Sequence, residues 1–248
     1  MCATCGCDGD GGPVITLPHE HPHEHGHEHP HRHPPTETIT LEQKVLAKND
    51  QLAERNRGWL ASRGITAFNM MSSPGAGKTT LLEHTIRHLG ESRQIAVIEG
   101  DQETLLDADR IKAAGCAVVQ VNTGSGCHLD ADMVRGALDT LAPASGSLLF
   151  IENVGNLVCP AMFDLGENGK VVLISVTEGD DKPLKYPHIF AAADLLIINK
   201  TDLLPYVDFD LKTCAQHAQS INRKLEIITT SATNGDGMDD WYQWIAEH

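Results

Sequence analysis

Three cysteines open the chain, and a histidine-rich tract follows them. Cys2, Cys5 and Cys7 lie within the first seven residues. Every odd position from 19 to 33 is a histidine, which gives His19, His21, His23, His25, His27, His29, His31 and His33. Thiolates and imidazoles bind transition metals such as Ni²⁺ and Zn²⁺, and residue types alone do not choose between these two metals. The cysteines form a compact set suited to tight binding, whereas the tract is suited to weak storage of several nickel ions.

The segment that carries these ligands is poor in core-forming side chains. Gly, Pro, His and Glu dominate residues 8–36, where Val14, Ile15 and Leu17 are the only large aliphatic residues. Such a stretch cannot bury enough apolar surface to offset the entropy lost on ordering. We therefore predict that residues 1–36 form an arm that is disordered without metal. A purification tag is an alternative origin of the histidines, but the interleaved acids and prolines favour a natural metal-storing tract.

A glycine-rich segment, Ser72-Ser-Pro-Gly-Ala-Gly-Lys-Thr79, has the spacing of a Walker A loop. It lies between an apolar run at 68–71 and a helical pattern at 80–89, as the motif requires. The backbone N–H groups would hold phosphates, the lysine would reach the β- and γ-oxygens, and the threonine would bind Mg²⁺. Ser72 replaces the usual first glycine, and a helix-capping turn without a ligand is the alternative interpretation. The predicted nucleotide-binding residues are Gly75, Ala76, Gly77, Lys78, Thr79 and Thr80.

A second motif, Asn199-Lys-Thr-Asp202, predicts which base is bound. A carboxylate at Asp202 can accept from both N1–H and the exocyclic amine of guanine, whereas adenine offers no such pair of donors on that edge. Asn199 and Lys200 would support this loop, and the backbone N–H groups of Ser231 and Ala232 would bind the guanine carbonyl. The motif is weak alone, but its place after the phosphate loop and before Ser231 favours GTP.

Two acids complete the predicted Mg²⁺ environment. Asp101 follows the apolar run at 95–99, and Glu152 ends the run at 148–152. A single loop acid is more often a solvated or helix-capping carboxylate, but the strand-end positions favour metal binding. We therefore predict Lys78, Asp101 and Glu152 as catalytic residues, and Thr79, Asp101 and Glu152 as the magnesium-binding set. Glu99 is a less clear member of this group.

A further set of nickel or zinc ligands lies in the predicted globular part. Cys127 and His128 follow the apolar run at 117–121, and Cys159 comes seven residues after Glu152. Two thiolates and one imidazole suit Zn²⁺ or Ni²⁺, but three ligands are too few for a closed structural site, so a symmetric dimer could supply the rest. Two small buried cysteines beside a polar loop histidine fit the residue types equally well.

Seven apolar runs alternate with helix-length segments after residue 64. They span 67–71, 95–99, 117–121, 148–152, 171–176, 195–199 and 227–230. This pattern predicts an α/β fold of the P-loop NTPase type, with a doubly wound, mostly parallel sheet of about seven strands and helices on both faces. One domain, residues 37–248, is expected. It would begin with a helix from Leu41 to about Arg63, where Thr40 and Gln43 fit a capping box.

Charge and composition exclude several classes of partner. The chain has 248 residues and a formal net charge of -15, which disfavours binding to nucleic acid and to anionic membranes. No apolar run is long enough for a membrane span, and the N-terminus does not resemble a secretory signal, so we predict a cytoplasmic protein. In that compartment the clustered cysteines are better explained as metal ligands than as disulfides.

Together these residues resemble the hydrogenase nickel-incorporation GTPases, the HypB family of SIMIBI-class P-loop GTPases. The resemblance covers almost the whole chain. It rests on the N-terminal cysteines and histidines, Leu46-Ala-Lys-Asn-Asp50, the phosphate loop, Glu99-Gly-Asp-Gln102, Gly126-Cys-His128, Glu152-Asn-Val-Gly-Asn156, Thr177-Glu-Gly-Asp180 and Asn199-Lys-Thr-Asp202.

The resemblance implies a Mg²⁺-dependent GTPase that dimerises with nucleotide and carries nickel at Cys127, His128 and Cys159. It implies delivery of nickel to the precursor of a [NiFe]-hydrogenase large subunit. The implied partners are the nickel- and zinc-binding maturation factor HypA and metallochaperones of the peptidyl-prolyl isomerase type. Two alternatives stay open: a nickel or zinc storage protein with a vestigial nucleotide site, and a urease-type nickel-insertion GTPase. An intact Lys78, Thr79, Asp101, Glu152 and Asp202 favour an enzyme over a storage protein.

Overall fold

A seven-stranded parallel sheet forms the centre of the protein. The computed structural model describes residues 36–101, 106–124 and 126–248, with side chains from residue 43 onward. The strand order is β3-β2-β4-β1-β5-β6-β7, and all neighbouring pairs are parallel. The strands are β1 (Thr66–Ser72), β2 (Ile95–Asp101), β3 (Ala117–Asn122), β4 (Leu148–Glu152), β5 (Gly169–Ser175), β6 (Leu195–Asn199) and β7 (Glu226–Thr229). This confirms the predicted fold class.

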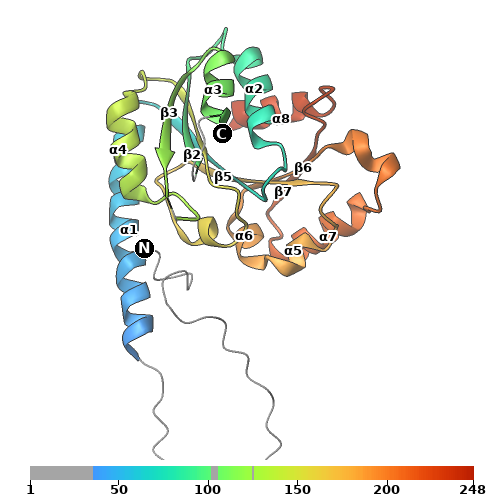
Figure 1. Ribbon diagram of the computed structural model, residues 1–248, viewed down its shortest axis with the longest axis horizontal. Helices are drawn as coiled ribbons and strands as arrows, with labels where there is room; N and C mark the ends of the chain where they lie inside the picture. Colours follow the sequence, from blue (N-terminus) through green and yellow to red (C-terminus); the bar gives the residue numbers. More distant parts are fainter. Residues whose placement is uncertain (1–35, 102–105, 125) are drawn as a thin grey trace, which may run out of the picture.

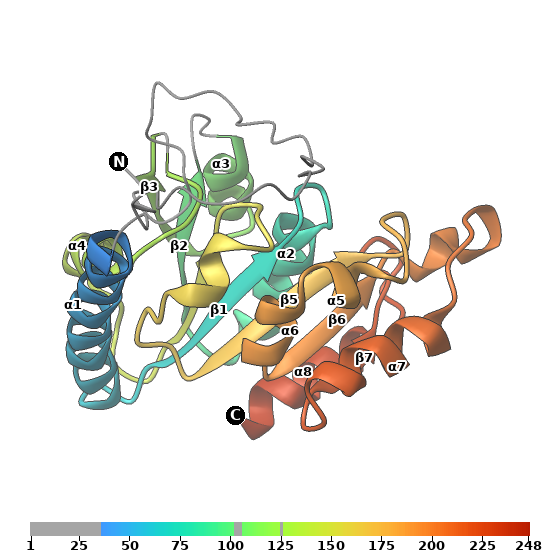
Figure 2. The same ribbon diagram turned by 90° about the horizontal axis from the view of Figure 1, so that it is seen from below.

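Helices cover both faces of the sheet (Figures 1 and 2). The α-helices are α1 (Thr36–Ala61), α2 (Lys78–Leu89), α3 (Leu106–Ala113), α4 (Ala131–Leu141), α5 (Lys182–Lys185), α6 (Pro187–Ala192), α7 (Leu211–Ile221) and α8 (Met238–Glu247). Two short 3₁₀ helices are η1 (Cys159–Met162) and η2 (Thr201–Tyr206). None of the helices in the described ranges is long and apolar enough to cross a membrane.

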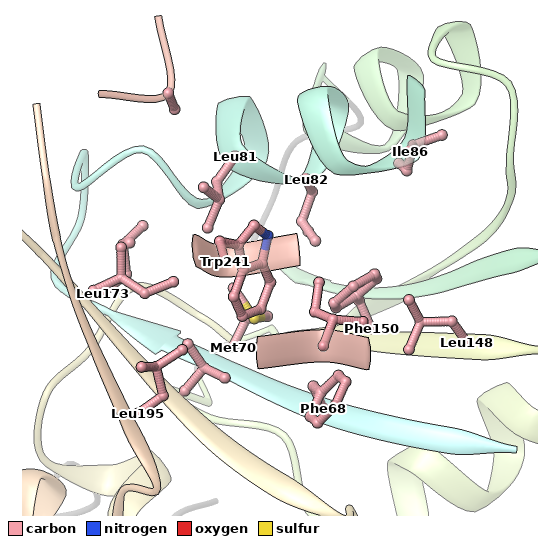
Figure 3. Close-up of a cluster of buried hydrophobic side chains, with 14 of the residues drawn as sticks. Phe68, Met70, Leu81, Leu82, Ile86, Leu148, Phe150, Leu173, Leu195 and Trp241 are labelled. Carbon is pink, nitrogen blue, oxygen red and sulfur yellow. The ribbon is translucent and has the colours of Figure 1, made fainter. Parts of the chain in front are cut away.

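Alternate residues of each strand supply the cores on the two faces, as the two-residue period of a strand requires. In β1, Phe68 and Met70 face α2 and α8, where Trp241 is fully buried and donates from Nε1 to Thr85 Oγ1 at 2.9 Å. Figure 3 shows Trp241 among the aromatic and aliphatic side chains of this cluster. Ala67 and Met71 face the opposite side, where α1 and α4 cover one half and α6 and α7 the other. Apolar cores on both sides make the sheet a rigid base for its loops.

The first helix departs from the sequence prediction. Helix α1 begins at Thr36 and ends at Ala61, whereas a start at Leu41 was expected. The helix runs through Thr40, so the predicted capping box is wrong. Residues 36–40 contain no Gly or Pro that would stop a helix, and Pro35 directly precedes the observed start. The predicted arm lies outside the described residues, except for Thr36.

The parallel arrangement places the strand ends that carry the predicted ligands at one edge. Asp101 ends β2 and Glu152 ends β4. The phosphate loop follows β1, the Cys127-His128 loop follows β3, and Asn199 ends β6. In open parallel sheets, ligands bind at the carboxyl ends of the strands. The sheet therefore gathers both predicted sites at this edge.

Candidate functional site

The phosphate loop has the backbone conformation that its glycines permit. Gly75 and Gly77 adopt positive φ angles of 74° and 104°, which residues with a Cβ rarely adopt. A Cβ at Gly77 would lie 2.5 Å from Asn199 Nδ2, so the loop also needs glycine for close packing. Ser72 is not among the positive-φ residues of the described chain, which explains why a serine fits where glycine is usual.

The Ser72 hydroxyl contacts the lysine of the loop, a contact that the sequence analysis missed. Lys78 Nζ donates to Ser72 Oγ at 2.7 Å, and Ser72 Oγ donates to Ser73 O at 2.6 Å. Lys78 is also buried. The serine therefore holds the ammonium group at the start of α2, where the helix N-terminus favours anions.

The predicted base-binding loop is fastened directly to the phosphate loop. Asn199 Nδ2 donates to Ala76 O at 2.9 Å, and Lys200 Nζ donates to Gly75 O at 2.7 Å. Asn199 is buried and Lys200 has a positive φ of 61°. The supporting role predicted for these two side chains agrees with these contacts, because they fix the distance between the phosphate and base regions.

Asp202 and the segment after β7 lie side by side. Ser231 Oγ donates to Asp202 Oδ1 at 2.6 Å. The backbone N–H groups of Ser231 and Ala232, predicted to bind the guanine carbonyl, both have protein acceptors here, namely Asp236 O at 2.9 Å and Asn199 Oδ1 at 3.1 Å. Binding of a guanine carbonyl at these N–H groups therefore requires them to exchange or share partners.

The acids at the ends of β2 and β4 form a buried negative cluster beside the phosphate loop. Glu152 Oε1 accepts from Thr79 Oγ1 at 2.8 Å, while its Oε2 has no hydrogen-bond partner among the described residues. Glu99 Oε2 is equally unpartnered in that part of the chain. Glu152 and Glu99 are 4% and 2% exposed, whereas Asp101 is half-buried. Unpartnered carboxylate oxygens beside a threonine hydroxyl match the oxygen ligands that Mg²⁺ prefers.

The same burial perturbs both glutamates. Burial raises the pKa of Glu152, although Lys78 and the Thr79 hydroxyl act in the opposite direction. Burial, and then the charges of Glu152 and Asp101, raise the pKa of Glu99 to about 8. A cation bound between these groups would oppose both shifts, because its charge stabilises the ionised carboxylates.

This cluster predicts that the nucleotide- and metal-free protein loses stability as pH rises. Glu99 has a higher pKa folded, about 8, than its ordinary 4.5, so the folded state holds the proton more tightly than the unfolded state. The contribution of Glu99 to the free energy of unfolding is then at its maximum below about pH 4.5. It falls as the pH rises to 8, by at most about 1.4 kcal/mol per pH unit. Urea unfolding between pH 5 and 8 should show this slope, and Glu99→Gln should flatten it. An unchanged slope in the variant would remove Glu99 as its source.

The structure brings the three predicted nickel ligands of the domain together. One ligand atom from each of Cys127, His128 and Cys159 lies within 4.8 Å of the others. The two Sγ atoms are 2.8 Å apart, and Cys127 Sγ is 3.7 Å from His128 Nδ1. Both cysteines are free thiols. Ligand atoms from the loop after β3 and from the segment after β4 converge on one point, and this convergence favours metal binding over the alternative of unrelated buried residues.

The surroundings of the imidazole in this cluster favour its neutral form. His128 is 8% exposed and stacks on Phe163, with ring centroids 3.9 Å apart. Burial lowers the pKa of His128, against a smaller opposing effect of Asp130. Neutral imidazole is the form that binds metals. The ring is therefore prepared to accept a soft or borderline cation without first losing a proton.

The remaining predicted ligands and cysteines are distributed differently. Cys2, Cys5, Cys7 and the eight histidines at odd positions 19–33 lie outside the described residues. Cys214 lies on the buried face of α7 and belongs to the core, as expected of a structural cysteine. Cys116 is only half-buried, and burial raises its thiol pKa to about 11. Neither belongs to the cluster formed by Cys127, His128 and Cys159.

Two side chains that the sequence analysis mentioned only as parts of a motif also support the site. Glu178, in the loop after β5, accepts from the Ser73 hydroxyl and from Ser175 N at 2.9 Å. Asn49 in α1 accepts at 2.9 Å from the backbone N–H of Ala131, which lies three residues after His128. The first contact links the phosphate loop to the end of β5. The second links α1 to the start of α4, just after the loop that carries Cys127 and His128. Their signal in the sequence is that both belong to motifs on which the family resemblance rests, Leu46-Ala-Lys-Asn-Asp50 and Thr177-Glu-Gly-Asp180.

Comparisons with known proteins agree with this geometry. Residues 66–229 match the family model described as CobW/HypB/UreG, nucleotide-binding domain. The hydrogenase maturation factor HypB of Escherichia coli K12 is 56% identical over 207 residues, which are 84% of this chain and 71% of that protein. The probable hydrogenase maturation factor HypB of Methanocaldococcus jannaschii is 43% identical over 207 residues, covering 84% of this chain and 94% of the relative.

Two solved structures share the fold at similar levels of identity. HypB from Archaeoglobus fulgidus matches with a TM-score of 0.76 and 41% identity, covering 81% of this chain and 98% of that one. HypB from Helicobacter pylori in complex with nickel matches with a TM-score of 0.76 and 38% identity, covering 81% and 94%. The chain therefore belongs to the CobW/HypB/UreG nucleotide-binding family and, within it, to the HypB hydrogenase maturation factors.

Proposed function

We propose that this protein is a Mg²⁺-dependent GTPase that binds nickel and delivers it to the large-subunit precursor of a [NiFe]-hydrogenase. The observation that carries the proposal is the cluster of Cys127, His128 and Cys159 at the same sheet edge as the phosphate loop. Glu152 contacts the loop threonine and begins the segment that leads to Cys159. One short segment therefore joins the nucleotide region to a metal ligand.

The nucleotide site supports hydrolysis as well as binding. Lys78 would neutralise the phosphates, and Thr79 would bind Mg²⁺ together with Asp101 or Glu152. Catalysis of phosphoryl transfer depends mainly on such positioning and charge stabilisation. Contacts of Lys78 and Thr79 within the described structure argue against a storage protein with a vestigial nucleotide site.

The chemistry of the cysteine and histidine cluster supports nickel as cargo. Three nitrogen and sulfur ligands leave a coordination position open, through which a metal can be exchanged. The Helicobacter pylori HypB structure was solved with nickel, and the same donor types are clustered here. Transfer would require that nucleotide changes the metal affinity, because a ligand shifts a conformational equilibrium only by binding its states differently.

Assembly, partners and cellular location remain part of this proposal. A nucleotide- and metal-dependent homodimer would complete the three-ligand site, and Zn²⁺ is the competing metal for it. HypA and metallochaperones of the peptidyl-prolyl isomerase type would supply or accept nickel in the cytoplasm, and the N-terminal histidines would store it. A Helicobacter pylori relative, 38% identical over 213 residues, is named a hydrogenase/urease maturation factor, so support of urease maturation is a second activity to assay.

Nickel titration of the full chain and of a chain starting at Thr36, each with and without GTP, tests the proposal. The full chain should bind extra, weaker ions through its arm, whereas the shortened chain should keep one nucleotide-sensitive class of site. If removing residues 1–35 abolished every nucleotide-sensitive site, the cluster at Cys127 would not be the delivery site.

The base assignment gives a separate prediction. Asp202→Asn should shift preference from GTP toward XTP, because an amide donates where guanine donates but where xanthine offers a carbonyl. The Ser231 hydroxyl can still pair with the new amide oxygen, so we expect the fold to be kept. Competition binding of the two nucleotides measures the change. An unchanged preference for GTP would show that Asp202 does not contact the base.

A further inference from the structure

Two asparagines join the loop that follows β4 to the backbone of the metal-binding segment. Asn153 Oδ1 accepts from Leu129 N at 3.1 Å, and Asn156 Nδ2 donates to Cys127 O at 3.3 Å. Leu129 and Cys127 are the residues on either side of His128. The loop that begins at Glu152 therefore holds the chain immediately before and immediately after the predicted imidazole ligand.

The Asn153 amide is fixed on all sides. It is 1% exposed, its Oδ1 also accepts from Val154 N at 3.0 Å, and its Nδ2 donates to Asn69 Oδ1 at 3.2 Å. Asn69, in the central strand, donates in turn to Glu167 Oε1 at 3.1 Å. A buried amide that makes three hydrogen bonds has a preferred orientation, because each lost bond leaves a desolvated polar group.

The same loop touches the nucleotide region at two points. Glu152, directly before Asn153, accepts from the Thr79 hydroxyl at 2.8 Å. Gly155, between the two asparagines, packs so closely on Pro74 of the phosphate loop that a Cβ would lie 3.0 Å from its Cα. A tilt of this loop about Gly155 would move Asn153 and Asn156 in opposite senses. The peptide segment 127–129 would then rotate and carry the imidazole with it.

We propose that Asn153 and Asn156 are positioning residues that set the direction of the His128 side chain relative to Cys159. The proposal rests on the proposed function, because it assigns these residues to the same metal site. It specifies how the site responds to nucleotide. Movement of Glu152 would turn the His128 side chain through the two asparagines. Cys159 lies on the same segment as Glu152, so the distance between the two ligands would change.

The test uses the full-length chain with Cys2, Cys5 and Cys7 replaced by serine and the arm histidines by glutamine. In this background, thiolate-to-nickel absorption reports on Cys127 and Cys159, and X-ray absorption reports on imidazole coordination. The test variants are Asn153→Ala, Asn156→Ala and Asn156→Asp. The last keeps an acceptor for Val158 N, which Asn156 Oδ1 now binds at 2.8 Å, and loses only the donor to Cys127. Asn156→Asp still tests the proposal if Asn153→Ala fails to fold.

With half an equivalent of Ni²⁺, the folded variants should retain thiolate absorption and lose the imidazole contribution, as is also expected of His128→Ala. The ratio of nickel affinities with GDP and with a non-hydrolysable GTP analogue should fall to within about twofold of one. Asn168→Ala is the matched control, since Asn168 is an exposed asparagine that accepts from Ala67 N at 2.8 Å at the other end of β1. It should behave as the background protein.

Imidazole coordination that persists unchanged in folded Asn156→Asp would overturn the assignment. If the background protein itself showed equal nickel affinities with both nucleotides, the coupling in the proposed function would fail. Loss of imidazole coordination in the variants would still support the positioning role, so the two failures are distinguishable.

Discussion

Lys78→Ala should lower the rate of GTP hydrolysis by about 10²–10³-fold or more, equivalent to about 3–4 kcal/mol of transition-state stabilisation. The ammonium group lies 2.7 Å from Ser72 Oγ at the start of α2, where the phosphates would bind. Its removal takes away the positive charge that offsets negative charge on the transferred phosphoryl group. Thr79→Ala should act similarly, because it removes the hydroxyl that would bind Mg²⁺.

Phosphate release under saturating GTP measures this effect, and nickel binding to the arm should be unaffected. Lys224→Ala is the matched control, because Lys224 is an exposed lysine between α7 and β7, far along the chain from the phosphate loop. Hydrolysis by Lys78→Ala at the rate of the unaltered protein would show that the Walker assignment is wrong.

The sheet could be predicted because its five inner strands are buried on both faces. Such strands appear in the sequence as continuous apolar runs. Each of the seven predicted runs matched an observed strand within one or two residues at either end. The Walker spacing also needs no tertiary information, since Gly75 and Gly77 reveal the positive φ angles locally. These features are encoded by short stretches of sequence.

Helix α1 could not be predicted equally well, because it packs through polar side chains whose partners are distant in the sequence. Asn56 Nδ2 donates to Ala131 O at 2.8 Å and to Leu165 O at 3.1 Å, and Asn49 bonds to the backbone at Asp164 and Ala131. Polar residues inside a helix weaken its amphipathic pattern in the sequence, yet here they bind α1 to the rest of the domain. The predicted start at Leu41 rested on a local capping pattern at Thr40, whereas residues 36–40 contain no Gly or Pro that would stop the helix.

The ligand cluster lies between these cases. The pairing of Cys127 with Cys159 could be anticipated, because parallel strands bring the loops after β3 and β4 to one edge. The roles of Asn153 and Asn156 could not, because an amide side chain reveals its partners only when loop geometry is known. Long-range hydrogen bonds therefore mark the limit of what residue types predict.

Cys159→Ala should lower the nickel affinity of the site formed by Cys127, His128 and Cys159 by more than about 100-fold with either nucleotide. The substitution removes one of the three side chains that would bind the metal directly. The thiol is 4% exposed and lies 2.8 Å from Cys127 Sγ, so no other side chain can take its place without rearrangement. The unaltered protein should bind Ni²⁺ with different affinities in the presence of GDP and of a non-hydrolysable GTP analogue. The difference arises because Glu152, bonded to Thr79, begins the segment that carries Cys159.

Chelator competition in the background without arm ligands measures both quantities. Cys116→Ala is the control, since Cys116 is a half-buried thiol that contacts Ile111 O and lies outside the ligand cluster. It should retain the affinity and the nucleotide dependence of the unaltered protein. Full nickel binding by Cys159→Ala would remove this thiol from the site. Equal affinities of the unaltered protein in the two nucleotide states would defeat coupled delivery even if GTP were hydrolysed, because transfer driven by a nucleotide requires a differential affinity between the states.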